Sequence, residues 1–77
     1  MRLDQFLADA GVSQAAFGKR VGVTQSAVAQ WVAGASISPE NVIRVAQASD
    51  WKVTPHELRP DLYPHPRDGM PRERAAA

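Results

Sequence analysis

The side chains of this chain best suited to chemistry are the amides of Gln25 and Gln30 and the hydroxyl of Ser26. They lie in a segment, residues 21–39, that contains no charged residue. A glutamine amide donates and accepts together, so it can pair with adenine in DNA, and a serine can pair with several base edges. An ordinary solvated helix face, which is the alternative, usually carries Lys or Glu. The pattern therefore favours recognition of base edges.

These side chains fall within a helix-turn-helix pattern over residues 14–33. Phe17 and Val21 are spaced to face one side of a first helix. Gly18 is small enough to let a second helix approach closely, and Gly22 can adopt the positive φ of a sharp turn. The turn and the second helix are then anchored from within by three apolar residues, Val23, Val28 and Trp31. The alternative is a set of short helices that pack together with no role in DNA binding.

A helix anchored through Val28 presents its other side outward, where it can enter a DNA major groove. A step of about 100° per residue keeps Thr24, Trp31 and Val32 near the core and leaves Gln25 on the flank. The residues predicted to turn outward are Ser26, Ala29, Gln30 and Ala33. The methyl group of Ala29 suits contact with a thymine methyl.

Polar and basic residues near the ends of the expected helices are candidates for phosphate contact. Gln14 opens the first helix of the pattern, where backbone N–H groups also point outward. Lys19 faces outward and Arg20 lies nearer the flank, and a phosphate contact and a solvated role are equally open for both. Ser36 and Asn41 flank the start of the next helix, where free N–H groups can also hold a phosphate.

The helix-turn-helix pattern and the segment before it account for three helices. Gly11 ends a first amphipathic helix, whose apolar face comprises Leu3, Phe6, Leu7 and Ala10. Ser13 is a good N-cap for the second helix, which runs to about Val21. Thr24 caps the third helix, over residues 24–33.

Two later segments begin with a hydroxyl residue followed by proline, which predicts the start of a helix. Ser38 caps a fourth helix that ends near Ser49. The apolar residues of this helix are Val42, Ile43, Val45 and Ala46. Thr54 and Glu57 have the spacing of a capping box, and Pro60 keeps that last helix short.

The sequence predicts one all-α domain over residues 1–63, a compact bundle of about five short helices. Residues 64–77 contain three prolines, one glycine and mixed charges, which is typical of a disordered tail. We find no convincing strand, although residues 51–54 can be briefly extended.

Composition bounds the class of protein. The chain has 77 residues and no cysteine, so neither a disulfide framework nor a thiolate metal site is expected to hold the fold. No apolar run approaches the roughly 20 residues that span a bilayer, and we expect a cytoplasmic protein with no membrane partner. The net charge of +1 is weak for a nucleic-acid binder. Residues 12–35 nevertheless contain Lys19 and Arg20 and no acid.

Catalysis and metal binding are not expected. His56 and His65 are the only histidines, and a proline-rich stretch separates them, so we predict no metal site and no cofactor. No serine has an obvious base partner, and so short a chain offers little room for an enclosed pocket. We predict that the protein is not an enzyme.

The remaining apolar and charged residues near the C-terminus have structural interpretations. Arg59 and Asp61 are spaced for a local ion pair that shapes the exit of the chain. We expect Val53 and Leu58 in the core. A core position and a dimer surface stay open for Trp51, Leu62 and Tyr63.

Three consecutive segments, QAAFGKRVGVTQSAVAQWVAG, ISPENVIRVAQAS and VTPHELRPDLYP, are similar to a known family. The chain resembles the small Cro-like, YdaS-type helix-turn-helix regulators of phages and prophages, some of which are described as antitoxins. The match spans about residues 1–64. One departure is Gly18, where alanine is commoner in the family and favours the helix more.

The resemblance implies a lambda-repressor-like all-helical domain that binds double-stranded operator DNA as a homodimer, at least on DNA. Carried over to this sequence, the phosphate contact falls on Gln14. The family's base contacts fall on Thr24, Gln25, Ser26, Ala29 and Gln30.

Together these features predict a cytoplasmic transcription regulator that represses by occupying a short, palindromic operator through the helix over 24–33. One alternative is an antitoxin that represses its own operon. Another is a protein-interaction module that keeps the helix-turn-helix scaffold and binds a toxin or a second regulator.

Overall fold

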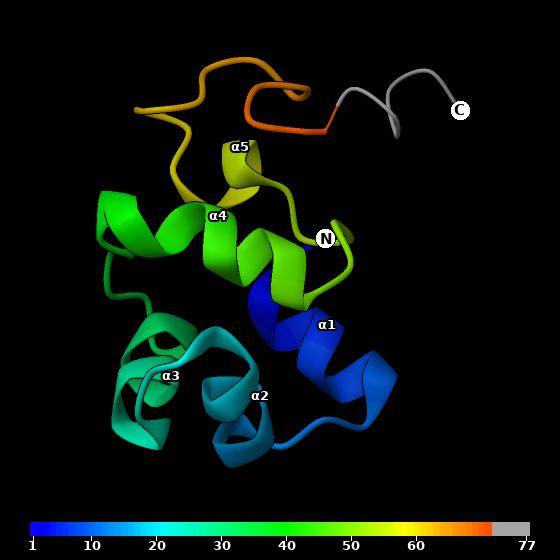
Figure 1. The fold of residues 1–77 in the computed structure, drawn as a ribbon, viewed down its shortest axis with the longest axis vertical. Coiled ribbons are helices and arrows are strands. Elements are labelled where there is room, and N and C mark those ends of the chain that lie inside the picture. Colours follow the sequence, from blue (N-terminus) through cyan, green and yellow to red (C-terminus); the bar gives the residue numbers. More distant parts are fainter. Residues whose placement is uncertain (72–77) are drawn as a thin grey trace.

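The computed structural model describes residues 1–71, and these form helices joined by turns, with no strand. The helices are α1 (Leu3–Ala10), α2 (Gln14–Val21), α3 (Gln25–Val32), α4 (Pro39–Ala48) and α5 (Pro55–Leu58). Helices α2 and α3 form one end of the molecule, α1 and α4 lie in the middle, and α5 with residues 59–71 lies at the other end (Figure 1). The predicted all-α bundle of five short helices is confirmed.

Hydroxyl side chains start three of the helices, as the sequence predicts. The Oγ atom of Ser13 accepts from the backbone N–H of Ala16 at 3.1 Å. The Oγ1 atom of Thr24 accepts from Ala27 N at 3.2 Å. At α5, Thr54 and Glu57 form the reciprocal hydrogen bonds of a capping box. Each cap satisfies a helical N–H group that has no carbonyl partner within its helix.

The predicted cap of α4 was wrong in its chemistry. Ser38 occupies the N-cap position, but its side chain accepts no backbone N–H. Its Oγ atom instead accepts from the Nδ2 atom of Asn41 at 3.0 Å. The start of α4 therefore depends on the fixed φ of Pro39 and on Glu40, an acid placed at the positive end of the helix.

The core lies where α1, α2, α3 and α4 meet. Phe17 and Phe6 pack edge to face, with ring centroids 5.9 Å apart. Four further side chains of this core, like that of Phe17, have no exposed surface: Val28, Val42, Val45 and Val53. Ser49 is the buried polar residue among them. Its hydroxyl donates to Ala46 O at 2.8 Å and accepts from Val53 N at 3.0 Å, so it ties the segment after α4 to that helix.

The close approach of α2 to the start of α3 depends on Gly18. A Cβ atom at this position would lie 2.9 Å from the carbonyl oxygen of Val23, closer than a carbon atom can pack. The turn between the helices also needs Gly22, whose φ of +92° is left-handed. The two glycines together permit the short connection that sets α3 against α2.

The segment after α4 differs from the sequence prediction. Of residues 51–54, Thr54 has an extended backbone as the N-cap of α5, but residues 51–53 form a turn and bends, because α4 ends in a tight turn in which Asp50 and Trp51 both have positive φ. The N–H of Trp51 donates to Ala46 O at 2.8 Å, which satisfies a carbonyl in the last turn of α4. Val53 is fully buried and Leu58 packs on the core, as expected.

The predicted tail begins at Pro64. In the structure, residues 65–69 form a bend and a turn, in which His65 N donates to the carboxylate of Asp68 at 3.1 Å. Gly69 lies against Pro55 and Tyr63, since a Cβ atom there would approach their side chains to within 3.0 Å. The rest of the predicted tail, 72–77, lies outside the described residues.

Among residues 1–71, no helix has the length and apolar character needed to cross a membrane. The longest, α4, has ten residues, whereas a membrane-spanning helix needs roughly 20.

Candidate nucleic-acid interface

The outward face of α3 is a set of exposed polar side chains. Gln25, Ser26 and Gln30 are all exposed, and their side chains make no hydrogen bond within the described part of the chain. Thr24 is exposed as well, rather than near the core, and its hydroxyl oxygen also caps the helix. Ala29, which was predicted to face outward, is half-buried.

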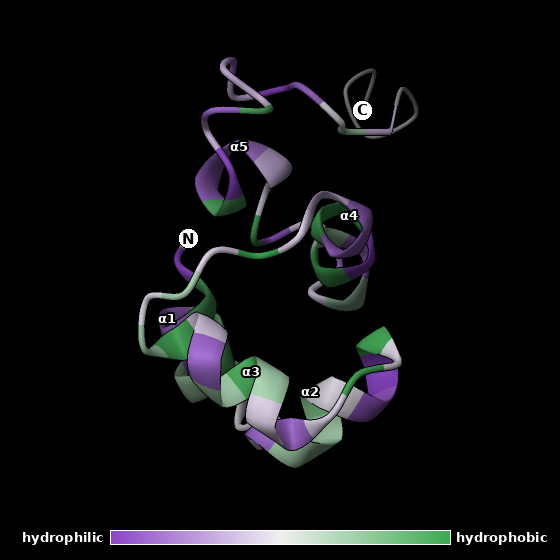
Figure 2. Cartoon of the chain, turned by 90° about the vertical axis from the view of Figure 1, so that its left-hand side faces the viewer, coloured by the Kyte–Doolittle hydropathy of each residue, from purple (hydrophilic) through white to green (hydrophobic). Residues whose placement is uncertain are grey.

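The opposite face of α3 is fixed by packing. Val28 has no exposed surface, and Trp31 and Val32 are half-buried against the core. Helix α3 contacts both α2 and α1, so it is held from two sides. The exposed polar face is therefore carried by a helix that cannot rotate without losing buried apolar contacts. Figure 2 shows α2 and α3 together at the end of the molecule remote from α5.

The charge around this face is positive and sparse. Lys19 and Arg20 are the only charged residues between Asp9 and Glu40 in the sequence, and both are exposed. They lie in the last turn of α2, where cations also interact favourably with the helix dipole. Their position is thus consistent with a phosphate contact and with a purely structural role.

The other candidates for phosphate contact differ in their exposure and in whether their side chains already make a hydrogen bond. Gln14 is half-buried at the first position of α2, and its side chain makes no hydrogen bond within residues 1–71. Ser36 is exposed in the loop before α4. Asn41 is half-buried and already donates to Ser38, so only its remaining amide N–H and its oxygen are free to bind a further group.

The ion pair predicted between Arg59 and Asp61 is confirmed and has a further partner. The Nε and Nη2 atoms of Arg59 donate to the two carboxylate oxygens of Asp61 at 2.9 and 2.7 Å. These hydrogen bonds lower the pKa of Asp61 below its ordinary value. The Nη1 atom of Arg59 donates to the carbonyl oxygen of Ile37 at 2.7 Å.

The bond to Ile37 was missed from the sequence. The spacing of Arg59 and Asp61 identifies them as a pair, but their third partner lies 22 residues away in the chain. Nothing in a local pattern distinguishes one backbone carbonyl from another. Only the packing of α5 on α4 brings Arg59 to the loop between α3 and α4, which contains Ile37.

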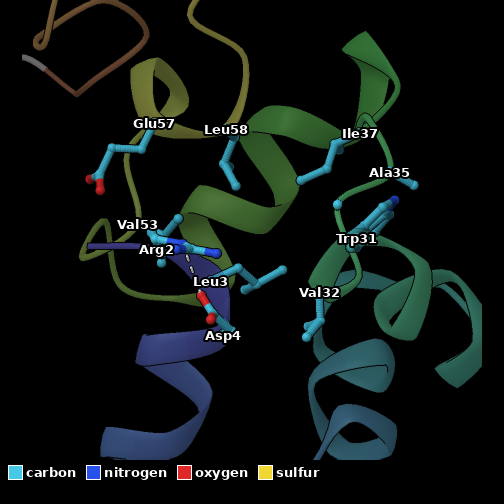
Figure 3. Close-up of a pocket in the computed structure, with 11 residues that line it drawn as sticks. Arg2, Leu3, Asp4, Trp31, Val32, Ala35, Ile37, Val53, Glu57 and Leu58 are labelled. Atoms are coloured by element: carbon cyan, nitrogen blue, oxygen red, sulfur yellow. Dashed lines mark ion pairs between the residues drawn. The ribbon is translucent and has the colours of Figure 1, made fainter.

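An open groove of about 200 Å³ adjoins the C-terminal end of α3 (Figure 3). Trp31 and Val32 lie on one wall, and Leu3 and Leu58 lie on the other. The rim carries charged residues, of which Arg2 and Asp4 pair with each other at 3.4 Å and Glu57 pairs with the N-terminal amine. This groove could not be predicted from the sequence, because its walls come from three separate segments.

The remaining chemistry-bearing residues serve the fold. His56 is half-buried, and its Nδ1 atom lies 2.8 Å from Tyr63 O. Within residues 1–71, no three His, Cys, Asp or Glu side chains gather closely enough to hold a metal ion.

A core position and a dimer surface were both open for three apolar residues near the C-terminus. Tyr63 packs on the core, Trp51 is half-buried and Leu62 is 43% exposed.

The chain matches the family model described as "Bacterial toxin YdaS" over residues 3–67. Because the match covers most of the chain, the protein belongs to this family, in agreement with the YdaS-type resemblance. No curated protein and no solved structure matches the chain.

Proposed function

We propose that this member of the YdaS family is a DNA-binding regulator whose helix α3 enters the major groove. The observation that carries the proposal is the outward face of α3, where Gln25, Ser26 and Gln30 are exposed and unbonded within residues 1–71. Bidentate amide contacts to adenine and hydroxyl contacts to base edges are the chemistry of sequence readout. In this proposal, α2, the turn and α3 act as a helix-turn-helix, and Thr24 and Ala29 complete the base contacts.

Phosphate contacts would position the reading face. Lys19 and Arg20 supply positive charge in a region without acids, and Gln14 and Ser36 supply neutral donors. Asn41 can add one more donor from the start of α4. Such contacts fix the register of the protein on the duplex and carry no sequence information themselves.

The assembly we propose is a homodimer on a palindromic operator, with repression by steric exclusion of polymerase. A single reading helix of eight residues contacts few bases. Two copies that bind half-sites about one helical turn apart would double the number of base contacts. This also offsets the low net charge of +1, since affinity then comes from two domains. The function requires no catalytic step and no cofactor.

The experiment that tests this function is selection of bound sequences from a random duplex pool at about physiological salt. We expect a palindromic sequence that binds with a Kd on the order of 10⁻⁸ M or tighter. Its half-site spacing gives the geometry of the dimer. Weak binding without any enriched sequence would contradict sequence-specific regulation.

A second candidate function is binding of a partner protein in a toxin–antitoxin pair. The description of the family as a bacterial toxin favours it, as does the groove beside Trp31, which can accept an apolar side chain. DNA binding and partner binding differ in their response to salt, because release of counterions from DNA makes the affinity fall steeply as salt rises. A partner complex formed without DNA affinity would favour this second function.

A further inference from the structure

We propose that Arg59, oriented by Asp61, is a positioning residue that holds the loop between α3 and α4 ready for DNA. The inference rests on the proposed function, because it concerns the loop that carries Ser36. Arg59 lies at the C-cap of α5, at the far end of the molecule from α2. It would act through the loop, with no DNA contact of its own.

The geometry of the guanidinium group carries the first step. Both carboxylate oxygens of Asp61 accept from the Nε and Nη2 edge of Arg59, at 2.9 and 2.7 Å. A two-point contact of this kind fixes the plane of the guanidinium group. The remaining Nη1 atom is thereby aimed at Ile37 O, 2.7 Å away. The Arg59 side chain is only 20% exposed, so its reach is also restricted by packing.

The loop itself has few other ties. Ala35 N donates to Gln30 O, and Asn41 N donates to Ser38 O, so both bonds are local in sequence. Within residues 1–71, the bond from Arg59 to Ile37 O is the one hydrogen bond that joins this loop to a distant segment. The buried Ile37 side chain is the other anchor. Ser36 precedes Ile37, so the position of its hydroxyl depends on these two anchors.

The consequence is preorganisation. A loop that is already ordered in the free protein loses little further conformational entropy when it binds a phosphate, whereas a flexible loop loses that entropy on binding. Loss of the Arg59 bond should therefore weaken binding to all duplexes and leave base preference intact, because the reading face of α3 is held by separate contacts.

The test compares Asp61→Asn with Asp9→Asn, using the operator recovered by selection. Each substitution removes one negative charge, and Asp9 is an exposed residue in the last turn of α1. A purely electrostatic effect would tighten DNA binding in both variants. Positioning predicts instead that Asp61→Asn weakens operator affinity by about tenfold, while Asp9→Asn leaves it equal or slightly tighter. Equal affinities of the two variants would overturn the inference.

A second variant and a double-mutant cycle guard against a general loss of folding. Arg59→Lys keeps the charge but lacks the planar fork, so it should weaken binding in the same direction. Ser36→Ala should lower affinity by itself, and Asp61→Asn should add little to it, because both act on one contact. Additive losses would contradict action through the loop.

Measurements on the free protein separate this inference from the proposed function. In ¹⁵N relaxation experiments, the amides of Ser36 and Ile37 should lose order in Asp61→Asn while the amides of α3 keep theirs. Unchanged order in the loop would overturn the positioning role even if the variant bound DNA less well. Failure of the unaltered protein to enrich any sequence would instead overturn the proposed function.

Discussion

The outward face of α3 and the segment from Thr54 to Asp61 use their polar side chains in opposite ways. In the later segment, Thr54 and Glu57 cap a helix, His56 meets Tyr63 O, and Arg59 binds Asp61 and a loop carbonyl. On α3, Gln25, Ser26 and Gln30 make no hydrogen bond within the described residues. The polar side chains of the later segment stabilise the fold, whereas those on α3 can bind a partner molecule.

This difference indicates where a partner is expected. A polar side chain that already holds the fold together cannot change partners without a loss of stability. A rigid helix whose polar side chains are unbonded can bind an external group with little reorganisation. We therefore propose that α3 binds the partner and that the segment from Thr54 to Asp61 stabilises the fold, and the following substitutions test that division.

Phe17→Ala should have the largest effect and should act on stability. Phe17 is fully buried beneath α3 and packs edge to face on Phe6. Removal of a buried aromatic ring costs about 3–5 kcal/mol, which is a large part of the stability of a small domain. The measurement is urea denaturation followed by circular dichroism. A midpoint close to that of the unaltered protein would show that the α2–α3 end is not packed as described.

Gln30→Ala should act on DNA affinity instead of stability. Loss of a bidentate base contact costs about 1–3 kcal/mol and relaxes preference at one base pair. The free energy of unfolding should change by no more than about 0.5 kcal/mol. Fluorescence anisotropy with the selected operator gives the affinity. Gln47→Ala, an exposed glutamine on α4, is the matched control. An equal effect of both variants would break the assignment of the reading face.

Thr24→Ala and Thr54→Ala sharpen the comparison, because both hydroxyls cap a helix at 3.2 Å. Each substitution should lower the stability by about 1 kcal/mol. Only Thr24→Ala should also weaken operator binding, since its cap lies on the exposed side of α3. Loss of DNA affinity in Thr54→Ala beyond that explained by unfolding would give the C-terminal segment a binding role.

Lys19→Gln should have the smallest effect and should be seen in the salt dependence. Loss of one phosphate contact reduces the slope of log K against log salt by about 0.9. Lys52→Gln, an exposed lysine after α4, is the control and should leave the slope unchanged. Affinity measured at several salt concentrations decides the matter. A reduced slope in Lys52→Gln, with the slope of Lys19→Gln unchanged, would place the phosphate contact after α4 and not on α2.

Much of the fold follows from local sequence. The caps at Ser13, Thr24 and Thr54 and the glycine at position 22 mark helix ends through contacts within a few residues, so they can be predicted. The cap at Ser38 could not, because the competing donor, Asn41, makes an equally short local bond. The turn at Asp50 and Trp51 was missed because non-glycine residues seldom adopt positive φ.

In the candidate site, too, the sequence predicts features that depend on local spacing and misses features that depend on packing. Helical periodicity was enough to place Ser26 and Gln30 on the outer face of α3, and it put Gln25, which is also exposed, on the flank. It misjudged Thr24, which is exposed, and Ala29, which is half-buried, since helical angle alone ignores the neighbouring side chains. The bond from Arg59 to Ile37 O and the groove beside Trp31 arise only when distant segments pack.

The most direct test of the central claim uses the side-chain amide resonances of the five glutamines in one NMR titration with the selected operator. The account predicts large shifts of the side-chain amide resonances of Gln25 and Gln30 and a smaller shift for Gln14, which is a candidate for phosphate contact. Gln5 and Gln47, exposed on α1 and α4, serve as internal controls and should not move. Shifts confined to Gln5 or Gln47, with Gln25 and Gln30 unchanged, would contradict DNA recognition by α3.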